Sequence, residues 1–372
     1  MKVLHVAGAR PNFMKVAPVL RALAERRVDN ILVHTGQHYD RSMSAAFFED
    51  LGLPEPDVHL EVGSGSHAEQ TARIMERIEP VLIDHAPDLT VVVGDVNSTI
   101  GAALVCAKLL LPVAHVEAGL RSFDRTMPEE INRILTDQLS DLLFTTSPEA
   151  EENLSREGIP SDRIRFVGNP MIDSLDRHLE QARSSGILDR LGLEPNRFAL
   201  VTLHRPSNVD DPETLGGILE ALKDVAAKVP VVFPAHPRTV KMMRAHSLDR
   251  LVRLDPTSVV AGAVSCIEPV GYVDFVRLMM DARVVLTDSG GIQEETTILG
   301  TPCLTLRWNT ERPITIELGT NTLIGPDPDS IRRSAAAAIE GPRPEPKRPP
   351  LWDGRAGERI ASEIVAWQAA RK

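Results

Sequence analysis

The sequence predicts an α/β protein made of two doubly wound domains in tandem. Short apolar, β-rich runs alternate with amphipathic helical stretches from the first residues onward, and 372 residues exceed what one hydrophobic core usually supports. Continuous apolar runs are typical of parallel strands that are buried on both faces. We therefore expect two Rossmann-like parallel sheets with helices between their strands, and a ligand cleft between the two domains.

Six apolar runs predict the strands of the first domain and five predict those of the second. The first series is Val3–Ala7, Ile31–Thr35, Leu89–Val93, Val113–Val116, Leu142–Thr145 and Ile164–Val167. The second series is Phe198–Thr202, Val231–Phe233, Val252–Leu254, Val284–Thr287 and Cys303–Leu306. A join near Gly168–Pro170 gives domains 1–169 and 170–355, and we expect the amphipathic helix within 356–372 to pack back on the first domain.

Composition excludes several classes of function. Acidic residues outnumber basic ones by eleven, so the chain has no overall positive field that would attract a polyanion. Aromatic residues are 4% of the chain, too few for the stacking surfaces of a protein that binds single-stranded nucleic acid. Cys106, Cys266 and Cys303 lie far apart in apolar surroundings, which predicts buried thiols instead of disulfides or a zinc site. Without a charged leader or a long apolar span, we expect a cytoplasmic protein that binds neither nucleic acid nor a membrane.

Charged residues follow several strands of the first domain, at the sheet edge where ligands of parallel sheets collect. A small-residue turn carries Arg10 into a helix start, and Lys15 lies about one turn further along. Asp95 follows the third run and Glu117 follows the fourth. The alternative interpretations are a helix cap for Asp95 and an ion pair with Arg121 for Glu117.

Two further patterns add candidates. The segment Pro128–Arg133 places Glu129 and Arg133 on one helix face, where an exposed ion pair is the alternative. In the second domain His204 and His236 each follow an apolar run. Two histidines at equivalent strand ends favour a functional role over a structural one.

The segment Thr287–Glu295 is the strongest local signal. A strand ends, Ser289 is followed by Gly290 and Gly291, and a helix begins, as in a phosphate site at a helix N-terminus. Glu295, about one turn into that helix, is placed to accept the two hydroxyls of a ribose. A plain glycine-containing turn is the alternative.

The segment Gly63–Ala68 matches a dinucleotide fingerprint with alanine in its last place. The match is weak because it lies after the second strand instead of in the opening turn of the domain. We interpret it as a loop before a helix over Ala68–Asp84, and we expect no nicotinamide cofactor and no metal.

Together these residues resemble the non-hydrolysing UDP-N-acetylglucosamine 2-epimerases nearly from end to end. The resemblance rests on Gly8–Pro11 with Lys15, Gly94–Asp95, His115–Arg121, Pro128–Arg133, Gly168–Asn169, Thr287–Glu295 and Glu311–Pro313. It implies the two-domain GT-B fold that many sugar-nucleotide glycosyltransferases share. It also implies a UDP-sugar substrate, no cofactor and a homodimer.

The resemblance implies roles for single residues. It implies that Glu295 binds the ribose. It also implies that the diphosphate contacts Arg10, His204, Ser289, Gly290 and Gly291. Phe275 matches an aromatic residue beside the uracil, and Arg312 matches an arginine near the nucleotide. The catalytic pocket falls on Asp95, Glu117, Glu129 and Arg133, with Lys15 beside them. Some members bind a second substrate molecule as an activator near the positions of Gln37, His38 and His236, although Tyr39 and Asp40 depart from that pattern.

The implied reaction inverts carbon 2 of the sugar by elimination. A base removes the carbon 2 proton while UDP leaves carbon 1, and the unsaturated sugar is reprotonated on its other face. Asp95, Glu117 and Glu129 offer proton donors and acceptors, with their assignment open, and crowding of like charges is expected to raise the pKa of at least one. His204 would stabilise the leaving diphosphate. A glycosyltransferase, a hydrolysing epimerase, a UDP-diacetamido-uronate epimerase and a silent nucleotide-sugar sensor are the alternatives.

Overall fold

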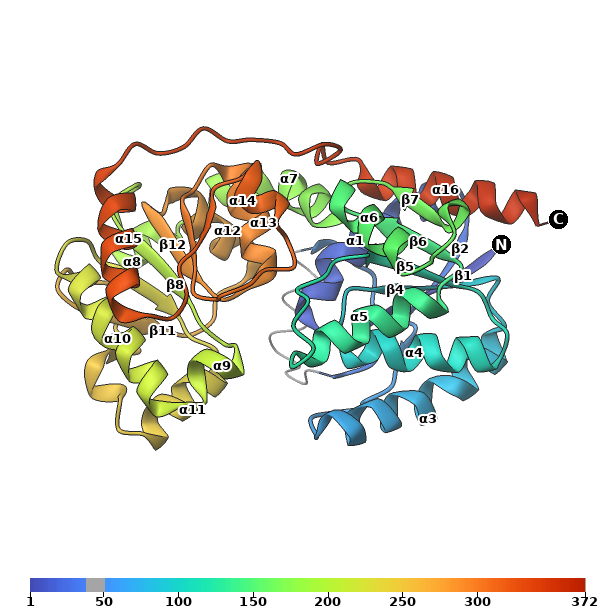
Figure 1. Cartoon of the computed structure of the whole chain (residues 1–372), viewed down its shortest axis with the longest axis horizontal. Coiled ribbons are helices and arrows are strands. Elements are labelled where there is room, and N and C mark those ends of the chain that lie inside the picture. The colour runs from blue at the N-terminus through green and yellow to red at the C-terminus, as the bar shows by residue number, and fades with distance from the viewer. Residues whose placement is uncertain (38–50, 372) are drawn as a thin grey trace. The chain divides into compact units, whose positions relative to one another are not determined.

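The computed structural model describes residues 1–37 and 51–371 and separates them into two compact units (Figure 1). Unit 1 contains Met1–Arg177 and Pro350–Lys372, and unit 2 contains His178–Pro349. Each unit holds one seven-stranded sheet, and every strand pair in the described residues is parallel. The predicted fold class of two doubly wound sheets is confirmed.

Unit 1 has the strand order β3-β2-β1-β4-β5-β6-β7. Its strands are β1 (Lys2–Ala7), β2 (Asp29–His34), β3 (Val58–His59), β4 (Leu89–Val93), β5 (Val113–Ala118), β6 (Leu142–Thr145) and β7 (Ile164–Phe166). Its helices include α1 (Arg10–Glu25), α3 (His67–His85), α4 (Asn97–Lys108), α5 (Pro128–Leu139), α6 (Pro148–Arg156) and α16 (Ala356–Ala370). The chain order reverses between β1 and β4, which is the switch point where doubly wound sheets bind ligands.

Unit 2 has the strand order β10-β11-β9-β8-β12-β13-β14, with its switch point between β8 and β12. Its strands are β8 (Ala199–Thr202), β9 (Val231–Pro234), β10 (Arg253–Leu254), β11 (Val264–Ile267), β12 (Val284–Thr287), β13 (Cys303–Thr305) and β14 (Asn321–Leu323). Its helices include α8 (Ile187–Leu191), α9 (Pro206–Val209), α10 (Pro212–Ala226), α11 (Pro237–Ala245), α12 (Tyr272–Asp281), α13 (Gly290–Leu299), α14 (Ile314–Glu317) and α15 (Pro328–Glu340).

All eleven predicted strands are present, but β3, β11 and β14 were not predicted. The polar Ser265 interrupts the apolar pattern of β11 although the structure buries it completely. Strands β3 and β14 lie at sheet edges and have two and three residues, so neither carries a recognisable apolar run.

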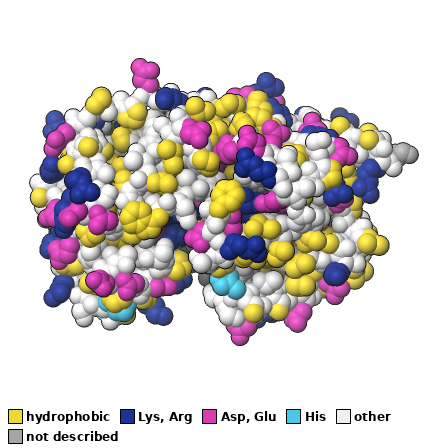
Figure 2. Space-filling view, viewed as in Figure 1, with side chains coloured by type: hydrophobic (Ala, Val, Ile, Leu, Met, Phe, Trp, Pro, Cys, Tyr) yellow, Lys and Arg dark blue, Asp and Glu magenta, His cyan; other side chains and the backbone are white. Residues whose placement is uncertain are grey.

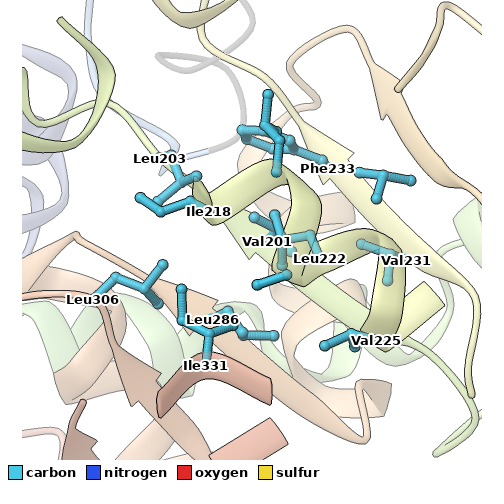
Figure 3. Packing of buried hydrophobic residues seen from close by; sticks show 14 of the residues in the cluster. Val201, Leu203, Ile218, Leu222, Val225, Val231, Phe233, Leu286, Leu306 and Ile331 are labelled. Carbon is cyan, nitrogen blue, oxygen red and sulfur yellow. The ribbon is translucent and has the colours of Figure 1, made fainter. Parts of the chain in front are cut away.

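Helix α10 shows how the sequence builds the core of unit 2. Leu215, Ile218, Leu219 and Leu222 recur at helical spacing and are fully buried. Together with Ile331 of α15 they belong to the cluster that packs on the strands of this unit (Figure 3). Each such side chain contributes about 1.5–3 kcal/mol by leaving water.

Helix α16 at the end of the chain packs on α1 at its beginning (Figure 1). Ile360 and Ile364 are fully buried on its inner side. Asp173 of α7 (Pro170–Arg183) accepts backbone N–H bonds from Ala356 at 3.1 Å and Gly357 at 2.7 Å, which caps the helix start. This last helix therefore belongs to unit 1.

The surface carries both signs of charge. On the face in Figure 2, lysine and arginine side chains are interspersed with aspartate and glutamate instead of forming one basic field. Cys106, Cys266 and Cys303 are free and buried, which confirms the prediction for the thiols. Within residues 1–37 and 51–371, no helix is long and apolar enough to cross a bilayer.

Candidate active site

The turn after β4 brings the first site residues of unit 1 together. Gly94 adopts a left-handed φ of 65°, which favours glycine. A Cβ atom on Gly94 would lie 3.4 Å from each of three groups, Asn12 Nδ2, Glu117 Oε2 and Lys15 Nζ. The turn that presents Asp95 therefore lies directly against the side chains of Lys15 and Glu117.

Lys15 and Glu117 form a buried ion pair. Lys15 Nζ contacts Glu117 Oε2, and the two residues are 4% and 3% exposed. Glu117 has a φ of 73°, and the register between β5 and β6 shifts between Val116 and Ala118. Left-handed backbone at a bulge is costly for a non-glycine residue and is typical of functional sites. The alternative pairing of Glu117 with Arg121 is wrong, because Arg121 binds other carboxylates.

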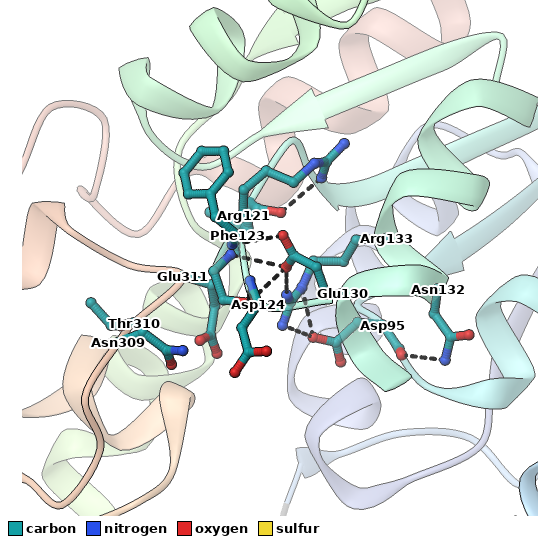
Figure 4. Close-up of polar contacts among 12 residues, drawn as sticks. Asp95, Arg121, Phe123, Asp124, Glu130, Asn132, Arg133, Asn309, Thr310 and Glu311 are labelled. Atoms are coloured by element: carbon teal, nitrogen blue, oxygen red, sulfur yellow. Dashed lines mark hydrogen bonds and ion pairs between the residues drawn. The ribbon is translucent and has the colours of Figure 1, made fainter. Parts of the chain in front are cut away.

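Arg133 holds Asp95 (Figure 4). Its Nε and Nη2 atoms lie 3.0 and 2.7 Å from Asp95 Oδ2, and Arg133 is 2% exposed. The Asp95 side chain remains 22% exposed, so a ligand can reach it. Helix α4 begins at Asn97 with Val96 as its N-cap, so the interpretation of Asp95 as that cap is wrong. Asp95 and Glu117 therefore each contact a positively charged side chain, Arg133 and Lys15 respectively.

Sequence reasoning assigned no role to Glu130, which organises the loop between β5 and α5. Glu130 accepts N–H bonds from Ser122 and Phe123 at 2.9 Å, and Arg133 Nη1 lies 2.6 Å from its Oε2 (Figure 4). Its neighbour Glu129 is half-buried on the same helix. The Glu-Glu pair was visible in the sequence, but only the packing shows which of the two is fully buried.

In unit 2, Asp288 orients His204 across the switch point between β8 and β12. Asp288 is fully buried, and its Oδ1 lies 2.9 Å from His204 Nδ1. It also accepts backbone N–H bonds from His204 at 3.0 Å and Arg205 at 2.9 Å. Burial opposes ionisation of Asp288, but His204 and these N–H donors hold its pKa below the usual value. Sequence reasoning had assigned Asp288 no role.

The expected strand, glycine turn and helix start are confirmed at α13. Ser289 is the N-cap, and Gly290 opens the helix. A Cβ atom on Gly290 would clash with Arg312 and lie 2.6 Å from Glu311 Oε1, so a larger residue here would displace this buried ion pair. The first turn of such a helix presents backbone N–H groups that suit an anion.

Arg312 belongs to a buried ion cluster behind that helix start. Its Nε lies 2.8 Å from Glu294 Oε1, and it also pairs with Glu311. Glu311 in turn accepts from Arg307 at 2.8 Å. Arg312, which the resemblance matches to an arginine near the nucleotide, lies behind the Gly290 turn and pairs there with Glu294 and Glu311.

Glu295 and Phe275 lie on the neighbouring helices α13 and α12. Glu295 is 3% exposed and accepts a hydrogen bond of 2.9 Å from the hydroxyl of Tyr272. Burial raises the pKa of Glu295 to about 8, against the opposing effect of the Tyr272 hydrogen bond and with help from Glu294. Phe275 is half-buried one turn after the start of α12.

The candidate activator residues lie in different units. Gln37 in unit 1 is 7% exposed, and its Oε1 accepts from the N and Oγ of Ser98 at 3.1 and 2.7 Å. His236 in unit 2 is exposed and caps α11 by accepting from the Arg238 N–H at 3.2 Å. His38 lies outside the described residues, as do Tyr39 and Asp40, and Arg10 is described only as the first residue of α1.

The weak dinucleotide match is a helix-capping loop, as interpreted. Ser66 is the N-cap of α3 and forms a capping box with Glu69. Elsewhere in the described residues, no group of three or more histidine, cysteine, aspartate or glutamate side chains is arranged to hold a metal ion.

Comparisons with known proteins find relatives along nearly the whole chain. Residues 21–365 match the family model for UDP-N-acetylglucosamine 2-epimerase. A protein of that name from Methanocaldococcus jannaschii is 41% identical over 97% of this chain and 98% of its own length. The UDP-2,3-diacetamido-2,3-dideoxy-D-glucuronate 2-epimerase of Pseudomonas aeruginosa is 42% identical over 98% of this chain and 99% of its own.

Solved structures give the same result. The M. jannaschii UDP-GlcNAc 2-epimerase in complex with UDP-GlcNAc and UDP matches with a TM-score of 0.91, over 99% of this chain and 100% of that chain at 41% identity. CalG4, the calicheamicin glycosyltransferase, is 17% identical with a TM-score of 0.52 over 99% of this chain and 98% of its own, and shares the fold alone. The GT-B-type fold is thus confirmed, and the chain belongs to the UDP-N-acetylglucosamine 2-epimerase family.

Proposed function

We propose that this protein is a non-hydrolysing 2-epimerase that interconverts UDP-N-acetylglucosamine and UDP-N-acetylmannosamine. The observation that carries the proposal is a pair of cation-bound carboxylates on neighbouring strands of unit 1, Asp95 just after β4 and Glu117 near the end of β5. These contacts orient two carboxylates, and a carboxylate can exchange a proton with a substrate. The named activity of the M. jannaschii relative supports the same substrate.

The reaction proceeds by elimination and addition. A base takes the proton from carbon 2, the C2–H electron pair forms a double bond to carbon 1, and the bond from carbon 1 to the diphosphate oxygen breaks with its electrons leaving on UDP. UDP then adds back to carbon 1 while carbon 2 receives a proton on its other face. Atoms and electrons balance without an oxidant or reductant.

Unit 1 supplies the proton transfers. Glu117, beside the Lys15 ammonium, and Asp95, held by Arg133, act on opposite faces of the sugar, with Glu129 as a third carboxylate on α5. A positioned acid or base contributes about 10²–10⁴-fold to such a step.

Unit 2 binds the nucleotide. The N–H groups at Ser289, Gly290 and Gly291 and the imidazole of His204 receive the diphosphate as its charge grows. Glu295 accepts the ribose hydroxyls, with Phe275 beside the uracil and Arg312 behind the glycine turn. Arg10 at the start of α1 in unit 1 is assigned to the same diphosphate.

The test follows the carbon 2 proton. Purified protein is incubated with UDP-N-acetylglucosamine in deuterated water, without added metal or nicotinamide, and followed by proton NMR. Deuterium at carbon 2 together with UDP-N-acetylmannosamine supports the proposal. Free N-acetylmannosamine plus UDP would identify a hydrolysing epimerase. Tight UDP-sugar binding without exchange would identify a sensor, and sugar transfer to an added acceptor would identify a glycosyltransferase.

A second substrate has an observation in its favour. The P. aeruginosa relative named for UDP-2,3-diacetamido-2,3-dideoxy-D-glucuronate is 42% identical, against 41% for the M. jannaschii protein. The reaction at carbon 2 would be the same, and the two substrates differ at carbons 3 and 6 of the sugar. Comparing kcat/KM for the two UDP-sugars decides between them.

We also propose that the protein is a cytoplasmic homodimer. Activation by a second substrate molecule near Gln37, His38 and His236 is tested in the same assay. The three free, buried thiols support a reducing compartment. Light scattering coupled to size-exclusion chromatography gives the mass of the protein, and cell fractionation gives its compartment. A hyperbolic dependence of rate on substrate would exclude activation by a second molecule.

A further inference from the structure

A buried ion cluster lies behind the candidate carboxylates of unit 1. We call it the His115 cluster; it consists of His115 on β5, Arg121 after β5 and Asp137 on α5, which are at most 3% exposed. Asp137 Oδ1 lies 2.6 Å from His115 Nδ1, and its Oδ2 lies 2.7 Å from Arg121 Nη2. Arg121 also binds Glu157 at the end of α6. None of the three residues has a part in the proposed proton transfers.

Both ring nitrogens of His115 face acceptors. Nδ1 meets the Asp137 carboxylate, and Nε2 lies 2.8 Å from the carbonyl oxygen of Gly94. Burial favours the neutral acid, but the charges of His115 and Arg121 hold the pKa of Asp137 below its usual value. The ring therefore bridges the Asp137 carboxylate and the Gly94 carbonyl, two groups that accept hydrogen bonds.

The cluster binds the backbone on both sides of the site. The Gly94 carbonyl immediately precedes Asp95, and Asp137 Oδ2 accepts the N–H of Gly119, two residues after Glu117, at 3.1 Å. Gly94 and Gly119 have φ values of 65° and 80°, and the strand register shifts at Glu117. The Gly94 N–H bonds to the Val116 carbonyl at 3.0 Å, and the cluster adds contacts to the Gly94 carbonyl and to the Gly119 N–H.

We infer that the His115 cluster is a positioning device that fixes the two turns bearing Asp95 and Glu117 for proton transfer. This inference rests on the proposed function. His115 acts through the Gly94 carbonyl and through Asp137, and it touches no reacting atom. A purely structural buried ion pair is the alternative, and it would affect stability without a selective effect on the chemical step.

The test is the variant His115→Gln, which removes the ring that bridges the two acceptors. We expect kcat for the epimerisation to fall about 10²-fold, since displacement of a catalytic group by about 1 Å costs that much. KM and the dissociation constant of UDP should stay unchanged, because most of the residues assigned to the nucleotide lie in unit 2 and none belongs to the His115 cluster.

The matched control is His5→Gln. His5 lies on β1 of the same sheet and is fully buried, but its Nε2 contacts Asn30 at 2.9 Å, away from both turns. Burial lowers the pKa of His5 to about 4, so its ring is neutral. We expect a lower melting temperature for both variants but an unchanged kcat for His5→Gln. Equal kcat values in the two folded variants would overturn the inference.

Asp137→Asn provides a second variant. In a single positioning unit the two changes are not additive, so the double variant with His115→Gln should be about as slow as the slower single variant. If the loss in kcat of the double variant equals the product of the two single losses, the residues act independently and the inference is wrong.

The proposed function and this inference fail in different ways. A wild-type protein that exchanges no carbon 2 proton would refute the proposed function. An active wild-type protein in which His115→Gln keeps the kcat of His5→Gln would refute the inference alone.

Discussion

The two units hold their site residues in different ways. In unit 1, the carboxylates at the strand ends are held by side chains of opposite charge, Lys15 for Glu117 and Arg133 for Asp95. In unit 2, the buried Asp288 is held largely by backbone N–H groups and leaves His204 44% exposed. The first arrangement orients carboxylates that can exchange protons with a substrate, whereas the second presents donors to an anion.

The largest expected effect comes from Glu117→Gln, which removes a proton acceptor but keeps the shape of the side chain. We expect kcat to fall about 10³-fold, within the usual range for a general acid or base. UDP affinity, measured by calorimetry, should stay unchanged because unit 2 is untouched. The surface change Glu363→Gln, which breaks an ion pair with Arg165 in the same unit, is the control. A simultaneous loss of UDP affinity would contradict the assignment of proton transfer to unit 1 and of nucleotide binding to unit 2.

Arg133→Lys tests the orientation of Asp95. Lysine keeps the charge but cannot reproduce the two contacts of Nε and Nη2 with Asp95 Oδ2 together with the Nη1 contact to Glu130. We expect kcat to fall about 10²-fold through misplacement of the carboxylate. Arg165→Lys, at a partly exposed ion pair, should leave kcat unchanged. An Arg133→Lys variant with full activity would show that Asp95 needs no fixed orientation.

The sequence was sufficient for the elements and for the residues at strand ends, because both follow from local apolar runs and the residues after them. It was not sufficient for the partners that hold these residues. Glu130, Asp137 and Asp288 are buried carboxylates whose importance depends on contacts across 8 to 84 positions of the chain. Ionisable residues in a sequence look exposed by default, and only packing shows which of them lose water and require a partner.

Glu295→Gln tests the proposed nucleotide site of unit 2. Replacing the carboxylate by an amide removes the charge that strengthens hydrogen bonds from the ribose hydroxyls. At a pH above 8, we expect UDP to bind about 10–100-fold more weakly, from a loss of about 1.5–3 kcal/mol. At saturating substrate, kcat should change little. Glu340→Gln, at a surface pair with Lys228 in the same unit, should leave binding unchanged.

The pH dependence of UDP binding is the smallest effect that we expect. Burial raises the pKa of Glu295 to about 8, so the free protein holds this group protonated near neutral pH. Two hydroxyl donors favour the ionised form, so binding lowers the pKa and releases a proton. Affinity should therefore rise with pH, by up to about tenfold per unit, until pH 8 is reached.

Calorimetry in buffers of different ionisation enthalpy measures the sign of this proton exchange. The wild-type protein alone reports the sum over all groups that exchange protons on binding, and Glu295→Gln removes the contribution of Glu295. If the release disappears in that variant, Glu295 is the group that ionises on binding. If both proteins exchange the same number of protons, the assignment of Glu295 to the ribose is wrong.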